Sequence, residues 1–348
     1  MTDRLEKEKT SELTQIKIFV GFIAAVIVVI ILEQLKSIFI PLFMALLLYF
    51  FFNGVVKRLL KLKIPKILVL SFLLIFIFII FYFFGVLIYA SVSSFIEKFP
   101  TYSDKIGEMI TNLFQQLKFS DYLEKIDWTK SIDTSAITSI LSSTFGSFVT
   151  FIGNLLLVLI FLMFMLAGRN ALTGRVNKAF DEDRADKVKF IINSIEDQVQ
   201  HYLLIKTFIS FLTGVISGII LFVAGADFII FSALLIFVLN FIPNFGSVIA
   251  TLFPIFIAVL KFGFSLRVVF LAAGLMVTQF FIGNAVEPKV TGKSLDLSPI
   301  VILISLIFWG YVWGIVGMIL AVPLTSAIKI FFENIPVLKP IAELISAD

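Results

Sequence analysis

Apolar runs long enough to cross a lipid bilayer recur along the whole chain. A helix needs about 20 mostly apolar residues to cross a hydrocarbon core of about 30 Å. The stretch from Ile67 to Ala90 meets this requirement and contains no charged residue. Similar stretches occupy residues 16–32, 38–52, 148–167, 208–223, 228–260, 268–282 and 297–328. The sequence therefore predicts an all-α, polytopic integral membrane protein with about eight transmembrane segments.

Composition supports this fold class and excludes several kinds of site. Of the 348 residues, 59% are hydrophobic and 15% are charged, against about 45–50% and about 25% in soluble domains. A soluble fold of this length could not bury so much apolar surface. The chain has no cysteine and a single histidine, His201, which excludes thiol catalysis and Cys- or His-rich metal sites. The net charge of +4 is too small to indicate nucleic-acid binding.

Basic residues beside the apolar runs indicate the orientation. The segment from Lys57 to Lys66 contains lysine and arginine but no acid, which places it in the cytoplasm by the positive-inside rule. Two crossings before this segment would put the N-terminus in the cytoplasm as well. The charged start, 1–12, is not followed by a small-residue cleavage site, so no cleavable signal peptide is evident. We expect a multi-pass protein of the cell inner membrane with both termini cytoplasmic.

The apolar runs divide the chain into regions. These are a three-span membrane region (1–92), an extracytoplasmic helical segment (93–146), a fourth span with a cytoplasmic helix (147–205), a C-terminal core with two broken-helix repeats (206–332) and a tail (333–348). In the extracytoplasmic segment the apolar residues at helical spacing are Phe99, Tyr102, Ile106, Met109, Leu113 and Leu117. This pattern predicts amphipathic helices that lie on the bilayer or on neighbouring subunits, with a small cap that has its own core as the alternative.

Helix-breaking and polar residues interrupt the long run 228–260. Asn240, Pro243, Asn244 and Gly246 fall together near its middle. Proline removes a backbone donor, and glycine permits non-helical backbone. Irregular backbone at membrane depth is tolerated only where it is buried in protein or lines a wet cavity. We therefore expect this stretch to contribute to a functional site.

The run 297–328 has a similar arrangement. Its polar opening and its breaks are Ser298, Pro299, Gly310, Gly314, Gly317 and Pro323. Each long run follows one shorter span, so 206–262 and 266–330 look like a weak internal duplication. Broken segments at matching positions in two halves are typical of the binding site of a secondary transporter. We predict two inverted repeats, each with one span and one re-entrant hairpin; two long kinked crossings are the alternative.

Glu287 is the ionisable residue that the pattern singles out. It follows Gln279 and Asn284 along an apolar helix and precedes Pro288, which ends that helix. An ionisable group at membrane depth is a candidate site for a proton or a cation. The alternative is that Glu287 lies at the membrane interface and caps the helix end beside Lys289.

The motifs of the C-terminal half resemble those of the AI-2E family, which includes autoinducer-2 exporters and PerM-like permeases. The matching positions are Asn240, Pro243, Asn244, Gly246, Gln279, Asn284, Glu287 to Ser294, Leu297 to Pro299, Trp309, Gly310, Trp313 to Met318 and Ala321 to Leu324. The resemblance is topological up to about residue 200 and specific from 240 to 325. It implies a bacterial inner-membrane permease that forms a homo-oligomer, with a pentamer as one form to test. Members are linked to autoinducer-2 export, and others to exchange of sodium or lithium for protons.

Three functions remain open from the sequence. The first is an ion- or proton-coupled secondary transporter that exports a small polar solute, such as an autoinducer-2-like signal. The second is a Na⁺(Li⁺)/H⁺ antiporter with Glu287 as the exchanging carboxylate, and the third is a membrane scaffold that transports nothing. The chain has no Walker loop and no GxSxG elbow, so neither an enzyme nor a cofactor is expected. The expected partners are membrane lipid, a small solute and Na⁺ or H⁺, but not nucleic acid.

Overall fold

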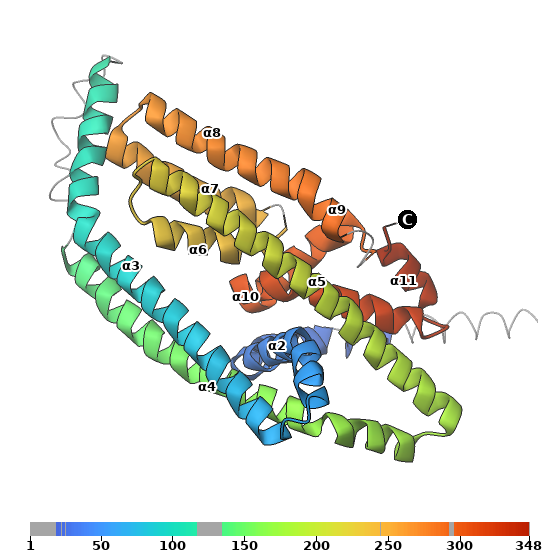
Figure 1. The fold of residues 1–348 in the computed structure, drawn as a ribbon. Coiled ribbons are helices and arrows are strands. Elements are labelled where there is room, and N and C mark those ends of the chain that lie inside the picture. Colours follow the sequence, from blue (N-terminus) through green and yellow to red (C-terminus); the bar gives the residue numbers. More distant parts are fainter. Residues whose placement is uncertain are drawn as a thin grey trace, which may run out of the picture.

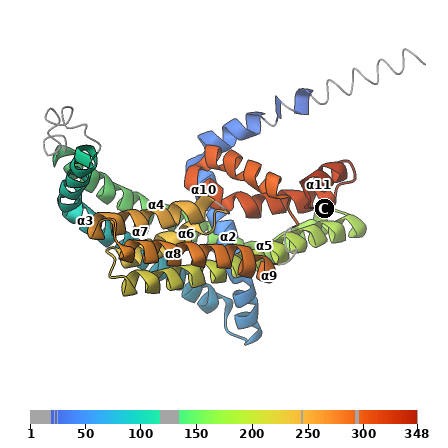
Figure 2. The ribbon, with the colours of Figure 1, turned by 90° about the horizontal axis from the view of Figure 1, so that it is seen from above.

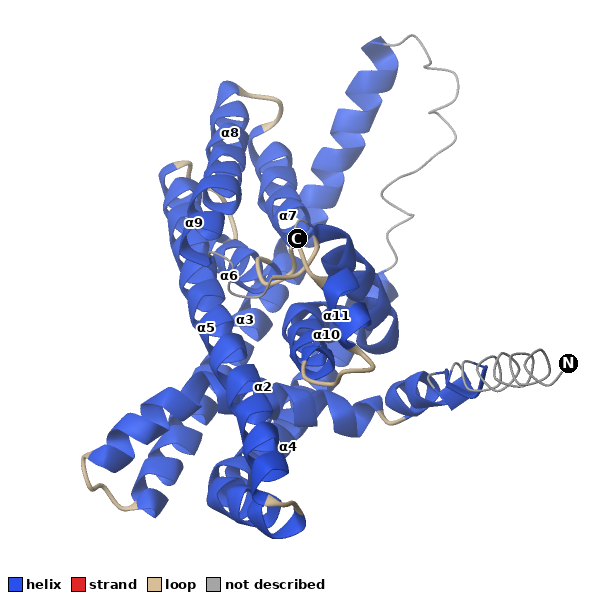
Figure 3. Ribbon diagram, turned by 90° about the vertical axis from the view of Figure 1, so that its right-hand side faces the viewer, coloured by secondary structure: helices blue, strands red, loops and turns tan. Residues whose placement is uncertain are grey.

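The chain is a bundle of long helices (Figure 1). The computed structural model describes residues 19–116, 134–291 and 296–347, except for 22, 25 and 244, and this part of the chain contains no strand (Figure 3). The helices are α2 (Lys36–Lys61), α3 (Lys66–Gln116), α4 (Thr134–Ala179), α5 (Glu182–Val223), α6 (Ile229–Leu239), α7 (Phe245–Phe262), α8 (Leu266–Phe281), the π-helix η2 (Ile282–Val286), α9 (Glu287–Thr291), α10 (Pro299–Glu333) and α11 (Lys339–Ile345). Among the described residues, 7 helices are long and apolar enough to cross a membrane. The predicted all-α polytopic fold is confirmed.

The first two apolar runs, 16–32 and 38–52, do not form an antiparallel pair. The described helix Phe19–Gln34 meets α2 at Leu35. Helical hydrogen bonds lead into and out of this residue, from Leu35 N to Ile31 O and from Phe39 N to Leu35 O, each at 3.0 Å. The chain therefore bends at Leu35 without reversing (Figure 2). The number of crossings before the basic segment, on which the predicted orientation of the N-terminus depends, stays a prediction.

Helix α3 extends well beyond the membrane-spanning length. It is unbroken over 51 residues, about 75 Å at 1.5 Å per residue, although its membrane-spanning part is Lys66–Lys98. It therefore runs straight through the region boundary expected at residue 92. Beyond the span, Tyr102, Ile106 and Met109 pack against Ile257 and Leu260 of α7. These three members of the predicted amphipathic stripe thus contact the core of their own chain. Leu117 and the side chains of Phe99 and Leu113 lie outside the described part of the structure.

Helices α6 and α7 form a helical hairpin, which we call hairpin 1. The two helices lie side by side (Figure 1), and the chain turns between them at residues 240–243. A Cβ atom at Gly246 would collide with the carbonyl oxygen of Leu239. Because only glycine lacks a Cβ atom, it alone permits this close approach of the two arms.

Helix α10 folds back on itself to form a second hairpin, hairpin 2. Its arms are the two halves of α10. Gly314 lies between them at φ 64° and ψ −144°. The hydroxyl of Ser305 donates to the carbonyl oxygen of Ala321 at 3.2 Å across the two arms. A Cβ atom at Gly317 would collide with the carbonyl oxygen of Trp309. The breaks at 240–246 and 309–317 are therefore both hairpin turns, and the alternative of two long kinked helices is wrong.

The two hairpins follow two antiparallel helices. Gly274 of α8 faces Ile220 of α5, and Glu287 after α8 reaches back to Lys206, nearer the start of α5. Since residue numbers rise along α8 as they fall along α5, these helices run in opposite directions. The bases of the hairpins consequently lie at opposite ends of the core (Figure 1). This is the geometry expected of an inverted repeat.

Candidate functional site

A line of buried polar side chains runs along α5. Lys206 is 3% exposed, and Ser210, Thr213 and Ser217 are each 0% exposed. Residues three or four positions apart share one face of a helix, so these four side chains form a continuous stripe, called here the α5 stripe. Polar groups so deeply buried in a membrane-spanning helix mark a candidate route for a solute or an ion.

Glu287 forms an ion pair with the first residue of the α5 stripe. Its Oε1 atom accepts a hydrogen bond from Nζ of Lys206. The side chain of Lys206 is 4% exposed and that of Glu287 is 27% exposed, so the cation is enclosed while the carboxylate keeps some access. The π-helix η2 directly precedes Glu287, and π-helical turns are frequent at functional sites. Removing either partner would leave the other charge buried and uncompensated.

Asn240 connects hairpin 1 to the same stripe. Its Nδ2 atom donates a hydrogen bond to Oγ of Ser210 at 3.0 Å, and the residue is 7% exposed. Ser210 lies one helical turn from Lys206. The structure therefore brings Glu287 and Asn240, both candidates from the sequence, onto one face of α5.

The turns of the two hairpins meet through apolar side chains. Ile242 of hairpin 1 packs against Leu306, Trp309 and Trp313 of hairpin 2. The indole Nε1 of Trp313 donates to the carbonyl oxygen of Leu32 at 3.0 Å, which ties hairpin 2 to the N-terminal helix. The space between the turns is thus filled by apolar groups. The α5 stripe beside the turns, rather than the turns themselves, carries the polar chemistry.

The core thus consists of two antiparallel spans, each followed by an opposed hairpin. A buried ion pair lies between the two spans. Residues 16–337 match the model of the family described as AI-2E family transporter. The chain belongs to the AI-2E transporter family. It is 30% identical over 315 residues to the AI-2 transport protein TqsA of Escherichia coli K12, across 89% of this chain and 90% of TqsA.

Two further AI-2E relatives share most of their length with this chain. A protein of Haemophilus influenzae is 31% identical over 320 residues, across 90% of this chain and 92% of the relative. A protein of Borreliella burgdorferi is 30% identical over 330 residues, across 91% of this chain and 88% of the relative. Both carry the name "Putative transport protein". Together with the family match, these relatives identify the chain as a membrane transporter.

Several candidate residues of this AI-2E transporter shape the hairpins and do not line the α5 stripe. Gly310 packs against Met318, where an added Cβ atom would lie 2.9 Å from the methyl carbon. Gly314 forms the turn of hairpin 2, and Pro323 is buried in its second arm. Pro243 lies half-buried in the turn of hairpin 1. Asn244 lies outside the described residues.

The remaining candidates lie along α8 and at the start of α10. Nε2 of Gln279 is buried and has no hydrogen-bond partner among the described residues. Asn284 is exposed and donates to the carbonyl oxygen of Phe280 in its own helix at 3.0 Å. The backbone N–H of Ser298 donates to the carbonyl oxygen of Ile345 at 2.9 Å, and Pro299 begins α10. Pro288 is exposed in α9. The structure does not bring these side chains to the α5 stripe.

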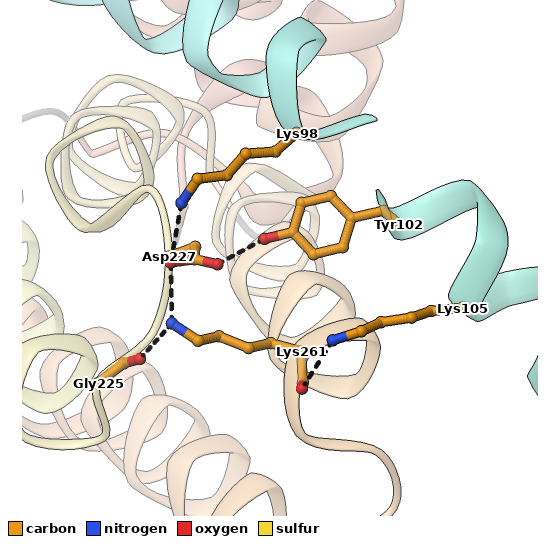
Figure 4. Close-up of polar contacts among 6 residues, drawn as sticks. All are labelled: Lys98, Tyr102, Lys105, Gly225, Asp227 and Lys261. Carbon is orange, nitrogen blue, oxygen red and sulfur yellow. Dashed lines mark hydrogen bonds and ion pairs between the residues drawn. The ribbon is translucent and has the colours of Figure 1, made fainter. Parts of the chain in front are cut away.

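A polar cluster lies at the base of hairpin 1 (Figure 4). Asp227 accepts hydrogen bonds from Oη of Tyr102 at 2.6 Å, from Nζ of Lys261 at 2.9 Å and from Nζ of Lys98 at 3.3 Å. Nζ of Lys105 donates to the carbonyl oxygen of Lys261 at 3.3 Å. The cluster ties the outer part of α3 to the core. Asp227 does not cap the following helix, since α6 begins after Phe228 without a side-chain cap bond.

The cluster shifts the pKa of both its acidic groups. Partial burial acts to raise the pKa of the Asp227 carboxyl, but the hydrogen bonds from Tyr102 and Lys261 and the positive charges of Lys261 and Lys98 outweigh it, so this pKa is lowered. Burial, followed by the hydrogen bond to Asp227 and its negative charge, raises the pKa of the Tyr102 phenol. Asp227 therefore stays ionised and Tyr102 stays a donor at neutral pH.

An apolar groove lies on another face of α5. Its volume is about 310 Å³, and its lining includes Phe84, Phe211, Gly214, Ala233 and Phe237. An acyl chain fits such a lining, whereas a polar solute would lose its hydrogen bonds there. The groove therefore does not compete with the α5 stripe as a solute site.

The sequence analysis missed Lys206 and the three small polar residues that follow it. It treated 208–223 as a plain span. The available signal was the interval of three or four residues between Lys206, Ser210, Thr213 and Ser217 in an apolar segment.

Proposed function

We propose that this chain is an ion- or proton-coupled secondary transporter that exports a small polar solute, such as an autoinducer-2-like signal, along the α5 stripe. Family membership and the AI-2 transport protein among its relatives support this function. The single observation that carries it is the ion pair between Glu287 and Lys206, placed one turn from the contact of Asn240 with Ser210. Lys206, Ser210 and Asn240 belong to the first repeat and Glu287 belongs to the second. A movement of one repeat therefore changes the contacts of the other.

The Glu287–Lys206 pair gives a physical means of coupling. While the pair is intact, its charges neutralise one another in a poorly solvated place. If Glu287 takes up a proton or pairs with Na⁺, Lys206 loses its counter-ion and its buried charge becomes unfavourable. Lys206 would then attract a polar or anionic group of the solute, or move toward water. Binding of the ion and binding of the solute are therefore linked at one residue.

The hairpins supply the gates. In transporters with inverted repeats, the ends of broken helices line the site, and the repeats move to open it to one side and then to the other. In this structure the turn of hairpin 1 contacts the α5 stripe through Asn240, and its Ile242 packs against the turn of hairpin 2. Withdrawal of one turn at a time would open the stripe toward one side of the membrane.

Flux through liposomes tests the proposal. Purified protein is reconstituted, and autoinducer-2 efflux is followed under a pH gradient or a sodium gradient, each varied separately. Glu287→Gln should abolish the gradient dependence. Glu287→Gln with Lys206→Met, which leaves no lone buried charge, should fold and abolish it as well. Glu196→Gln is the matched control, because Glu196 is a buried acid in an ion pair with Lys57 between α5 and α2. Gradient-dependent efflux that survives Glu287→Gln would contradict the proposed coupling.

The second candidate is the Na⁺(Li⁺)/H⁺ antiporter. The observation that favours it is the partial exposure of the Glu287 carboxylate beside a buried cation, since an exchanging acid must be reached from outside the protein. Sodium-driven proton movement in liposomes without any organic solute would support this function over solute export. If neither ion nor solute moves, the scaffold function remains.

We also propose that the protein resides in the bacterial inner membrane, with both termini cytoplasmic, as a homo-oligomer. The basic segment from Lys57 to Lys66 supports the orientation. Because the natural chain has no cysteine, single cysteines introduced at the termini can be labelled from either side to test it. Native mass spectrometry in detergent would count the subunits.

A further inference from the structure

Each hairpin has an aspartate–lysine ion pair at its base. In hairpin 1, Nζ of Lys261 contacts Oδ1 of Asp227 at 2.9 Å. In hairpin 2, Nζ of Lys329 contacts Oδ2 of Asp296 at 2.6 Å. The two pairs lie at opposite ends of the core, because the hairpins point in opposite directions.

The two pairs occupy equivalent places in the two repeats. Each aspartate lies in the linker just before the first arm, Asp227 before α6 and Asp296 before α10. Each lysine lies near the end of the second arm. Each lysine also donates to a backbone carbonyl of the same linker, Lys261 to Gly225 at 3.0 Å and Lys329 to Asp296 at 2.7 Å. The correspondence thus includes the main-chain contact as well as the ion pair.

Each linker also has a left-handed residue that directs the chain into the first arm. Phe228 has φ 55°, and Asp296 has φ 44°. Residues other than glycine adopt this conformation rarely and at some cost. A costly conformation in the linker of each repeat indicates that the linker geometry is held by its contacts.

We infer that Asp227–Lys261 and Asp296–Lys329 are duplicated positioning pairs, called here the hairpin staples, that close the bases of the two hairpins and hold their turns in contact with one another beside the α5 stripe. The functional part of this inference rests on the proposed transport function; the structural part does not. In lipid, two apolar helices gain little from burying apolar surface against one another, so close packing and polar links must hold them together. A hairpin that is open at its base would let its turn drift.

Burial makes the second staple the more sensitive of the two. The side chain of Lys329 is 4% exposed, and it also contacts Glu333 at 3.2 Å in its own helix. Asp296 reaches it from the linker at the other side of the base. In the first staple Lys261 is 32% exposed, and Lys98 and Tyr102 of α3 share its aspartate. The second staple therefore gives the cleaner experiment.

The test measures the distance between the two turns without any solute. Cysteines introduced at Phe245 and Ile315, which are 52% and 60% exposed, are spin-labelled in a chain that has no other cysteine. Pulsed electron paramagnetic resonance in lipid nanodiscs then gives a distance distribution. The test variant is Asp296→Asn with Lys329→Met, which removes both charges and so avoids an unfolded protein caused by a lone buried lysine. We expect its distribution to be at least twice as wide as that of the parent.

A control pair separates a positioning role from a general loss of stability. Lys57→Met with Glu196→Gln removes another long-range ion pair, between α2 and α5, that lies at neither hairpin base. This variant should keep the parent distribution. A narrow distribution in the staple variant, or equal widening in the control, would overturn the inference.

Autoinducer-2 efflux gives the second readout. We expect the staple variant to lose about tenfold in maximal rate while the half-saturating concentration changes less than twofold, because the turns close less often but the stripe is intact. Unchanged efflux kinetics would refute the functional role even if the distribution widens. If the parent protein transports no autoinducer-2, the transport proposal fails and the distance measurement still decides whether the staples position the turns.

Discussion

Glu287 and Lys206 form an ion pair across two antiparallel helices, although 81 residues separate them in the chain. The register between α5 and α8 sets this meeting, and Gly274 of α8 lies beside Ile220 of α5 at the other end of the same interface. The pair therefore depends on the packing of both repeats. Any movement of one repeat against the other changes the environment of both charges.

A double-mutant cycle should reveal the strength of this pair. Lys206→Met leaves the Glu287 carboxylate without its cation and should lower the free energy of unfolding by about 3–5 kcal/mol. Lys206→Met combined with Glu287→Gln removes both charges and should recover most of that loss. Chemical unfolding in detergent micelles measures Lys206→Met, Glu287→Gln and the double variant. A double variant whose loss equals the sum of the two single losses would mean that the two residues act independently.

The turn of hairpin 1 should not tolerate a side chain at Gly246. Gly246→Ala places a methyl group on the carbonyl oxygen of Leu239, so the arms must separate. We expect a loss of about 1–3 kcal/mol in the free energy of unfolding. Gly153→Ala in α4 is the control, because a Cβ atom there meets nothing within 4 Å. Thermal unfolding should show a lower midpoint for Gly246→Ala and no decrease for Gly153→Ala.

Ser217 offers a test of the α5 stripe that is independent of charge. Its hydroxyl is buried and, among the described residues, has no hydrogen-bond partner. Ser217→Ala should therefore leave stability unchanged or raise it by about 1 kcal/mol. If the hydroxyl contacts the solute, autoinducer-2 efflux should fall several-fold at the same time. A variant with full efflux would place the solute route elsewhere.

Acid should release the outer part of α3 from hairpin 1. Because the pKa of Asp227 is lowered in the folded protein, its contribution to stability is complete above the ordinary value of about 3.9 and is lost as the pH falls through the folded pKa. Hydrogen exchange around Tyr102 should be slow at pH 6 and should rise below about pH 4 relative to the intrinsic exchange rate. In Asp227→Asn the same region should exchange quickly at both pH values. Equal protection of the parent protein at both pH values would show that Asp227 does not hold the contact.

The sequence was sufficient to predict the helical fold, and it offered the hairpins as one of two alternatives. Lipid-length apolar runs permit few structures other than helices, and Pro243, Gly246 and Gly314 each forbid or interrupt a regular helix at a definite place. Such signals are local, so one sequence is enough to detect them. The same local character explains why the π-helix before Glu287 went unnoticed, since no single residue there demands it.

The contacts of the charged residues could not be predicted in the same way. Lys206, Asp227 and Lys329 each bind partners that lie at least 33 residues away in the chain or on another helix. Their pairing depends on helix register and on the direction in which each hairpin folds back. For the same reason the bend at Leu35 could not be told from a reversal, because both would interrupt an apolar run at the same polar residues.

The unbroken course of α3 from Lys66 to Gln116 has a mechanical consequence. One continuous helix joins the group of N-terminal helices to Asp227 at the base of hairpin 1. An antibody fragment that binds the part of α3 beyond the membrane span would also restrain that base without entering the lipid. A binder held on the part of α3 outside the membrane would then hold hairpin 1, inside the bilayer, in one position.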